Sequence, residues 1–168
     1  PIKLNYNFPL VFTRSTNVYG AYQQLYRIIP RSIINMKMGR KIQLQGGGKA
    51  VKSYIHIEDV SNATLKIARD GINGDTYHIS PEGDGISIYA LVAKIASMLG
   101  KKAEKYIEIV EDRKGQDATY VIDSSKIRSE LGWTTKIDLD EGINGVIRWI
   151  DKYFDEIKNC PKEYIHKP

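Results

Sequence analysis

Residues that could carry out catalysis are present, but none stands at the spacing of a known catalytic motif. The three histidines, His56, His78 and His166, lie far apart without a nearby nucleophile or carboxylate partner, so each is interpreted as a surface or structural residue. None of the 11 tyrosines has a lysine four residues later, and no Gly-x-Gly-x-x-Gly or nucleophile elbow occurs. Cys160 is the one cysteine. The sequence therefore predicts neither a catalytic residue nor a metal site.

The basic residues offer a different chemistry, the binding of a small anion. The formal net charge is +5, and basic pairs fall at Arg40-Lys41, Lys101-Lys102 and Arg113-Lys114. These pairs alternate with acidic residues and form no single stripe, which argues against a nucleic-acid groove. Two interpretations stay open: these side chains are solvated surface residues, or a few of them lie in a cleft and bind an anionic ligand.

Length and composition favour one water-soluble domain. The chain has 168 residues, of which 42% are hydrophobic and 27% charged. No apolar run approaches the roughly 20 residues that span a bilayer. A single cysteine favours a cytoplasmic protein, because a disulfide framework is excluded. The sequence opens on Pro1 without a Met or a signal pattern, which suggests a piece of a longer protein.

The elements that must position these residues follow from apolar periodicity and from glycine stops. A buried strand is expected first, and Gly46-Gly47-Gly48 is expected to be a turn, because it lacks the spacing of a phosphate loop. The predicted strands are Leu10–Arg14, Ile42–Leu44, Ser53–Ile57, Thr76–Ile79, Tyr106–Val110 and Tyr120–Ile122. The predicted helices run over Ile28–Met38, from about Val60 to Gly71, from the cap Ser87 to Gly100, over Ser124–Leu131, and from the cap Asp138 to Ile157. This mixture predicts an α/β or α+β protein with small sheets.

Four segments, in this order, resemble the second half of the NAD-dependent epimerase/dehydratase family of extended short-chain dehydrogenases/reductases, in particular its dTDP-glucose 4,6-dehydratase members. Thr13-Arg14-Ser15-Thr16-Asn17-Val18-Tyr19-Gly20 is similar to the family's strand and Asn-x-Tyr-Gly-Pro turn. Leu25-Tyr26-Arg27-Ile28-Ile29-Pro30 resembles its Lys-Leu-Ile-Pro segment. Val51 to Val60 and Asp112 to Asp117, with Leu131-Gly132-Trp133 after them, resemble its Arg-containing strand and its Asp-Arg-Pro-Gly-His-Asp and Leu-Gly-Trp segments.

The resemblance implies the carboxy-terminal, substrate-binding portion of a Rossmann-type fold of the α/β class. Residues 1–24 would hold the last strand of the Rossmann sheet and a ligand-side turn, residues 25–157 the substrate-binding lobe, and residues 158–168 a tail. NAD and the Tyr-x-x-x-Lys pair would be held mainly by an amino-terminal half. Leu10–Arg14 would then lack its sheet partners within this chain, so roughly the first 20 to 30 residues would self-associate or stay mobile.

The resemblance also implies which residues meet the ligands. Lys52, where the family usually has Arg, and Arg113 would bind the pyrophosphate of a nucleotide sugar. Asn17 would bind a phosphate or a sugar hydroxyl, and the backbone of Val18 would touch NAD. The remaining expected substrate-binding residues are Arg27, Ile28, Gln43, Leu44, Gln45, Ser87, Asp112 and Gln116. His56 and Asp59 match the family motif but are expected to serve structure, and Trp133, Trp149 and Tyr153 are expected in the core.

The expected activity is an NAD-dependent nucleotide-sugar 4,6-dehydration, of the kind used in polysaccharide biosynthesis, in a cytoplasmic homodimer without a nucleic-acid or membrane partner. This chain alone is expected to be inactive. Two alternatives stay open: a 4-epimerase or decarboxylase of the same superfamily, and a nucleotide-sugar binding module without catalysis.

Overall fold

The computed structural model describes residues 8–112, 115 and 117–162. The chain divides into two compact units, each assembled from three separate segments. Unit 1 comprises Pro1–Val18, Lys52–Gly85 and Tyr120–Leu139. Unit 2 comprises Tyr19–Val51, Ile86–Thr119 and Asp140–Pro168. The α/β class with small sheets is confirmed, because short strand pairs alternate with helices in both units.

Unit 1 contains a parallel pair of strands, β1 (Phe12–Ser15) and β6 (Thr76–Ile79), in register from Phe12↔Thr76 to Ser15↔Ile79. The backbone N–H of Thr16 continues the pairing, donating to Ile79 O at 3.1 Å. The expectation that the first strand lacks a partner within this chain is therefore wrong, because β6 supplies one. The expectation that this strand is buried is also wrong. Three of its four residues are exposed, and 51% of the surface of Phe12 is accessible to solvent.

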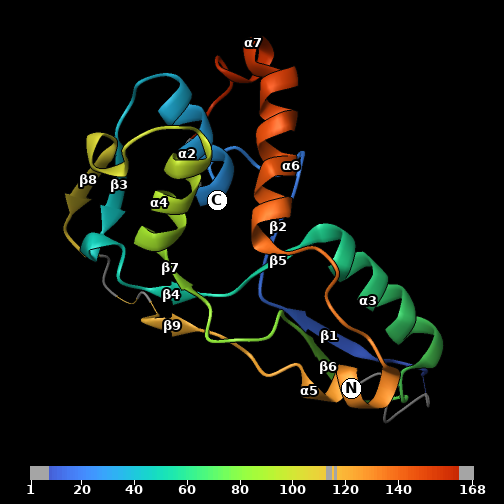
Figure 1. The fold of residues 1–168 in the computed structure, drawn as a ribbon. Helices are drawn as coiled ribbons and strands as arrows, with labels where there is room; N and C mark the ends of the chain where they lie inside the picture. Colours follow the sequence, from blue (N-terminus) through green and yellow to red (C-terminus); the bar gives the residue numbers. More distant parts are fainter. Residues whose placement is uncertain (1–7, 113–114, 116, 163–168) are drawn as a thin grey trace. The chain divides into compact units, whose positions relative to one another are not determined.

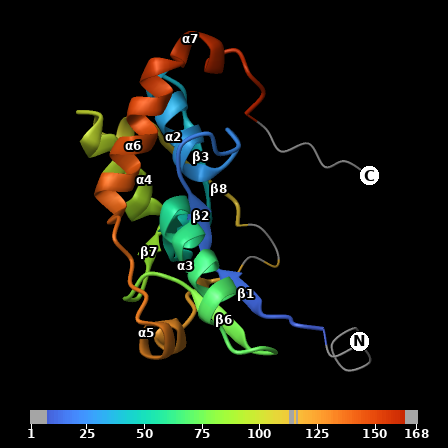
Figure 2. The same cartoon turned by 90° about the vertical axis from the view of Figure 1, so that its right-hand side faces the viewer.

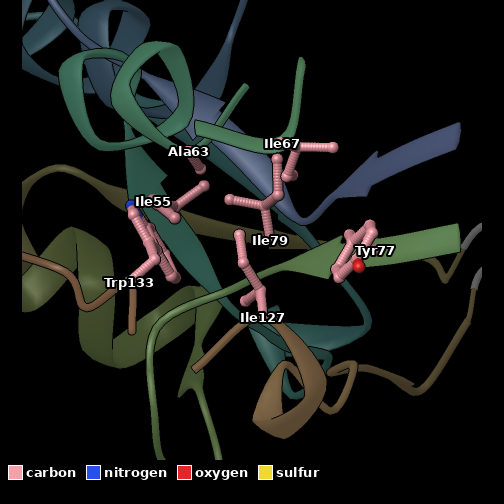
Figure 3. Close-up of a cluster of buried hydrophobic side chains, with 7 residues drawn as sticks. All are labelled: Ile55, Ala63, Ile67, Tyr77, Ile79, Ile127 and Trp133. Carbon is pink, nitrogen blue, oxygen red and sulfur yellow. The ribbon is translucent and has the colours of Figure 1, made fainter. Parts of the chain in front are cut away.

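Two helices cover the β6 strand of unit 1. Helix α3 (Ile57–Asp70) begins after His56 and ends before Gly71, and α5 (Ser125–Leu131) ends at Gly132, whose φ of 62° suits a glycine. Both helices contact β6 (Figures 1 and 2). The side chains that pack between these elements form the core of the unit, and Figure 3 shows them gathered in one group: Ile55, Ala63, Ile67, Tyr77, Ile79, Ile127 and Trp133.

Unit 2 is built around a second parallel pair, β3 (Ile42–Gln45) and β8 (Ile107–Val110). Helices α2 (Ile28–Lys37) and α4 (Ile88–Met98) pack against each other beside it (Figures 1 and 2). Helix α6 (Leu139–Lys152) and the short α7 (Phe154–Ile157) complete the carboxy-terminal segment. The 3-10 turns η1 (Gly46–Gly48) and η2 (Ala103–Lys105) follow β3 and α4.

The remaining strands are very short. The strands β2 (Asn17–Tyr19) and β5 (Tyr54–His56) form a pair. The two-residue strands β7 (Ile86–Ser87), β4 (Val51–Lys52) and β9 (Thr119–Tyr120) form one sheet in the order β7-β4-β9. No helix in the described part of the chain is long and apolar enough to cross a membrane.

Most predicted helices and strands are confirmed to within two or three residues, but the last helix is not continuous. Tyr153 leaves the helical conformation at a φ of −117° and a ψ of 25°, which separates α6 from α7. Trp133 is a core residue, as predicted, at 5% exposure. Trp149 and Tyr153 are only half-buried, so their core assignment is wrong: Tyr22, itself 75% exposed, packs on them at ring distances of 5.3 and 6.2 Å.

Two glycines of α6 provide a matched test of packing in unit 2. A Cβ at the buried Gly142 would collide with the ring of the buried Tyr19, lying 2.7 Å from its Cζ. A Cβ at Gly145 would meet only Arg148 Nη2, at 3.8 Å. We expect Gly142→Ala to lower the free energy of unfolding by about 1–3 kcal/mol through overpacking. Gly145→Ala should raise it by about 0.5–1 kcal/mol through helix propensity.

Urea unfolding of both variants, followed by far-UV circular dichroism, measures the two changes. Equal effects of the two substitutions would contradict the packing of Tyr19 against Gly142.

Candidate functional site

The backbone around Lys52 is the most tightly fixed part of the predicted site in unit 1. Asn17 donates two hydrogen bonds to Ser53 O, from its backbone N at 3.2 Å and from Nδ2 at 3.0 Å. Ser53 N in turn donates to Tyr120 O at 3.2 Å. A Cβ at Gly85 would lie 2.8 Å from Lys52 O, so the positive φ of 80° and the close approach both require glycine. The structure thus brings Asn17 and Lys52, two predicted ligand residues, to neighbouring positions.

The side chain of Lys52 lies over an aromatic ring. Its Nζ is 5.8 Å from the centroid of the Tyr120 ring, within the range of a cation–π interaction. Burial raises the pKa of the nearby Tyr54 phenol, so this tyrosine stays protonated at neutral pH. Binding of an anion by Lys52 stays a prediction.

Val18 faces the interior of unit 1 with its side chain. That side chain packs against the core cluster shown in Figure 3. The expected contact of Val18 with NAD concerns its backbone and stays a prediction.

In unit 2 the three predicted residues of β3 point in alternating directions. Leu44 is 1% exposed, so its side chain belongs to the core. Gln43 and Gln45 are exposed, and Gln43 Nε2 donates to Glu108 Oε2 of β8 at 3.2 Å. A ligand can therefore reach the side chains of the two glutamines, but it cannot reach the buried side chain of Leu44.

Asp112 lies against the glycine turn that follows β3. A Cβ at Gly46 would be 2.8 Å from Asp112 Cγ, and the φ of Gly46 is 56°. The structure thus places two predicted residues, Gln45 and Asp112, beside the same turn. As predicted, Gly46–Gly48 forms a turn. Arg113 and Gln116 lie outside the described residues.

Three further predicted residues stand at helix starts in unit 2. Arg27 occupies the N-cap position of α2, with its guanidinium carbon 5.5 Å from the centroid of the Tyr26 ring, and Ile28 is the first residue of that helix. Ser87 caps α4, as predicted, because its Oγ accepts a hydrogen bond from Ala90 N at 3.1 Å. The structure therefore gives Ser87 a local structural function, and ligand binding by all three residues stays a prediction.

His56 and Asp59 serve structure, as expected. His56 Nδ1 accepts from Glu58 N at 3.4 Å at the start of α3. Asp59 is 2% exposed, and its carboxylate accepts from Lys136 N at 3.0 Å and from Ile137 N at 3.1 Å. Asp59 thus fixes a distant segment of unit 1 to α3, a function that goes beyond the helix-dipole effect expected from the sequence.

The sequence did not predict a role in the candidate site for three residues that position Lys52: Ser53, Gly85 and Tyr120. A signal for Tyr120 exists, since it follows the Asp-Arg-Lys-Gly-Gln-Asp segment as the aromatic residue of a short strand. Ser53 and Gly85 act through their backbones, which no side-chain pattern reveals. Among the described residues, no group of three or more His, Cys, Asp or Glu side chains could hold a metal ion.

Comparison with known proteins gives this arrangement a family context. The family model of GDP-mannose 4,6 dehydratase matches residues 2–146. The dTDP-glucose 4,6-dehydratase of Haemophilus influenzae is 32% identical over 154 residues, which cover 86% of this chain and 45% of the relative. That of Mycolicibacterium smegmatis is 34% identical over 146 residues, covering 86% and 44%. The chain thus spans about half the length of the curated relatives it matches.

Solved structures agree with this match. The dTDP-glucose 4,6-dehydratase of Bacillus anthracis, determined in complex with NAD, has a TM-score of 0.84 at 30% identity and matches 91% of this chain and 48% of its own. The UDP-glucose 4-epimerase of Thermotoga maritima, determined with UDP-glucose, has a TM-score of 0.83 at 24% identity, covering 90% and 49%. The second likeness shows a shared fold alone.

The buried carboxylate of Asp59 provides a test of the structural assignment. Asp59→Asn keeps the shape but turns one acceptor into an NH₂ group that faces a backbone N–H, so we expect a loss of about 1–3 kcal/mol in the free energy of unfolding. Glu58→Gln, one residue earlier in the same helical turn and exposed, is the matched control, with an expected change below about 0.5 kcal/mol.

Thermal unfolding monitored by circular dichroism compares the two variants with the parent chain. Similar melting temperatures for Asp59→Asn and the parent would show that the carboxylate does not fix the Lys136–Ile137 backbone.

Proposed function

The chain belongs to the GDP-mannose 4,6 dehydratase family, and on this basis we propose that it is the carboxy-terminal, nucleotide-sugar-binding part of an NAD-dependent nucleotide-sugar 4,6-dehydratase. The match to residues 2–146 carries this proposal. The identity of 32–34% to dTDP-glucose 4,6-dehydratases supports a substrate of the dTDP-glucose type. Residues 25–157 would form the substrate-binding lobe, preceded by a Rossmann-sheet strand and turn in residues 1–24 and followed by a tail in residues 158–168.

The proposed chemistry of this chain is recognition of a diphosphate. A nucleotide sugar carries about two negative charges on its pyrophosphate, and these charges require cations or N–H donors. Lys52 is such a cation, held on a backbone that Asn17 and Gly85 fix. Arg113 is proposed as the second cation. Gln43 and Gln45 would lie along the nucleotide base, and Arg27, Ile28, Ser87, Asp112 and Gln116 would complete the substrate contacts.

For NAD, the described residues support a proposal limited to a contact at the edge of the cofactor. The one strand that leads directly into consecutive glycines, β3, continues into the turn Gly46–Gly48 and then β4, without the helix that would receive a dinucleotide's phosphates. The backbone of Val18 is the proposed contact. The chemistry that NAD would supply when bound is acceptance of a hydride from the sugar and its later return to the sugar. The residues described here would bind and orient the sugar nucleotide.

The alternatives are distinguishable. Epimerases share the fold, but the epimerase structure compared above is only 24% identical to this chain, whereas the dehydratases reach 30–34%. We therefore favour the dehydratase over the 4-epimerase or decarboxylase. A binding module without catalysis would bind the same sugar nucleotides. We further propose a cytoplasmic setting and a homodimer for the whole protein.

The first test is the affinity of the chain for a nucleotide sugar. Lys52→Ala should weaken binding of dTDP-glucose by about ten- to a hundredfold, because a charge-assisted contact contributes about 1.5–3 kcal/mol. Lys49→Ala is the matched control: it removes the same charge at an exposed position three residues earlier and should leave affinity within about twofold.

Isothermal titration calorimetry with dTDP-glucose, UDP-glucose and GDP-mannose measures these affinities and ranks the nucleotide bases. Melting temperatures without ligand should differ little between the variants. The diphosphate assignment fails if Lys52→Ala and Lys49→Ala bind with the same affinity.

The second test concerns turnover. Incubation of this chain with NAD and dTDP-glucose should yield no 4-keto-6-deoxy product, because its sequence contains neither the glycine fingerprint nor a Tyr-x-x-x-Lys pair. The complete Haemophilus influenzae relative is the positive control. Product formation above a no-protein blank would show that the chain carries a catalytic group that its motifs do not reveal.

A further inference from the structure

The ring of Tyr120 lies beside Lys52, the described cation of the proposed site. The Lys52 Nζ lies 5.8 Å from the centroid of its ring. We propose that Tyr120 is a positioning residue: its ring holds the Lys52 ammonium in the place where it binds the diphosphate of a nucleotide. This inference rests on the proposed function and adds a residue to the same site.

The backbone prepares this pair. Ser53 N donates to Tyr120 O at 3.2 Å, so the residue after Lys52 is joined directly to Tyr120. Asn17 holds Ser53 O with two hydrogen bonds, and Gly85 approaches Lys52 O too closely for any side chain. The Cα of Lys52 and that of Tyr120 are therefore fixed relative to each other within unit 1. The path of the four-carbon Lys52 stem then determines where its ammonium lies.

The Tyr120 ring can fix the position of the Lys52 ammonium. An ammonium has no planar fork to fix its direction, in contrast to a guanidinium, and a lysine side chain loses much rotamer entropy when a ligand immobilises it. The negative face of a tyrosine ring attracts a cation within about 6 Å. An ammonium that is already held there loses less entropy on binding a diphosphate, so the ring increases affinity without touching the ligand.

The substitutions at Tyr120 separate the ring from its packing. Tyr120→Phe keeps the aromatic face, so the affinity of the chain for dTDP should stay within about twofold of the parent value. Tyr120→Leu keeps an apolar side chain but removes the face, and affinity should fall about two- to fivefold. In a Lys52→Met background, Tyr120→Leu should cause no further loss, because the ammonium that the ring holds is absent.

A second measurement needs no ligand. The ε-methylene protons of Lys52 should show an upfield ring-current shift in the NMR spectrum of the parent chain and of Tyr120→Phe. Tyr120→Leu should abolish this upfield shift. Melting temperatures of the single variants establish that each is folded before either measurement is interpreted.

The outcomes are distinct. Unchanged dTDP affinity in Tyr120→Leu, or a loss that persists in the Lys52→Met background, would overturn the positioning by Tyr120 while leaving the proposed function in place. A parent chain that binds none of dTDP, UDP and GDP would contradict the proposed function. The ring-current shift then still decides the contact itself: equal Lys52 shifts in the parent and Tyr120→Leu would show that the ring and the ammonium do not meet.

Discussion

The hydrogen bonds of the Ser53 backbone are the constraint on which the site of unit 1 depends. Its carbonyl accepts from Asn17 twice, and its N–H donates to Tyr120 O. Three segments that are far apart in the sequence meet at this one residue, and Ser53 itself is 2% exposed. A buried backbone group without such partners would cost free energy, so the three segments keep a fixed relation. Because Lys52 directly precedes Ser53, these hydrogen bonds also fix its backbone position.

The sequence was sufficient to predict the helices, but it was insufficient to predict which strands pair with one another. Apolar periodicity and glycine stops identified α2, α3, α4 and α5, because a helix forms its hydrogen bonds within one segment. The partner of β1 could not be found this way, since β6 lies far along the chain and a strand pattern does not name its neighbour. The pattern also failed at Trp149 of α6 and at Tyr153, which lies between α6 and α7, because Tyr22 covers both side chains only partly.

The predicted site residues differ in the contacts that their side chains already make, and the reason is physical. Motif resemblance identifies positions, whereas the structure decides what each side chain already does. Leu44 is a core residue, and Ser87 uses its Oγ to cap α4. Asn17 uses Nδ2 to hold Ser53 O. Residues that act through their backbone, such as Gly85, carry no side-chain signal at all, yet a Cβ there would displace the carbonyl of Lys52.

Because position 52 carries an ammonium and not a guanidinium, the surroundings of this residue are important. A guanidinium specifies direction through its own fork, whereas an ammonium is a point charge on a flexible stem. Neighbouring groups must then orient the Lys52 side chain. The hydrogen-bonded backbone fixes its Cα, and the Tyr120 ring attracts its ammonium. Under the proposed function, the chain would contribute to turnover in this way, because accurate placement of a diphosphate determines where the attached sugar lies. The precision of that placement would then depend on the rigidity of the Ser53 backbone.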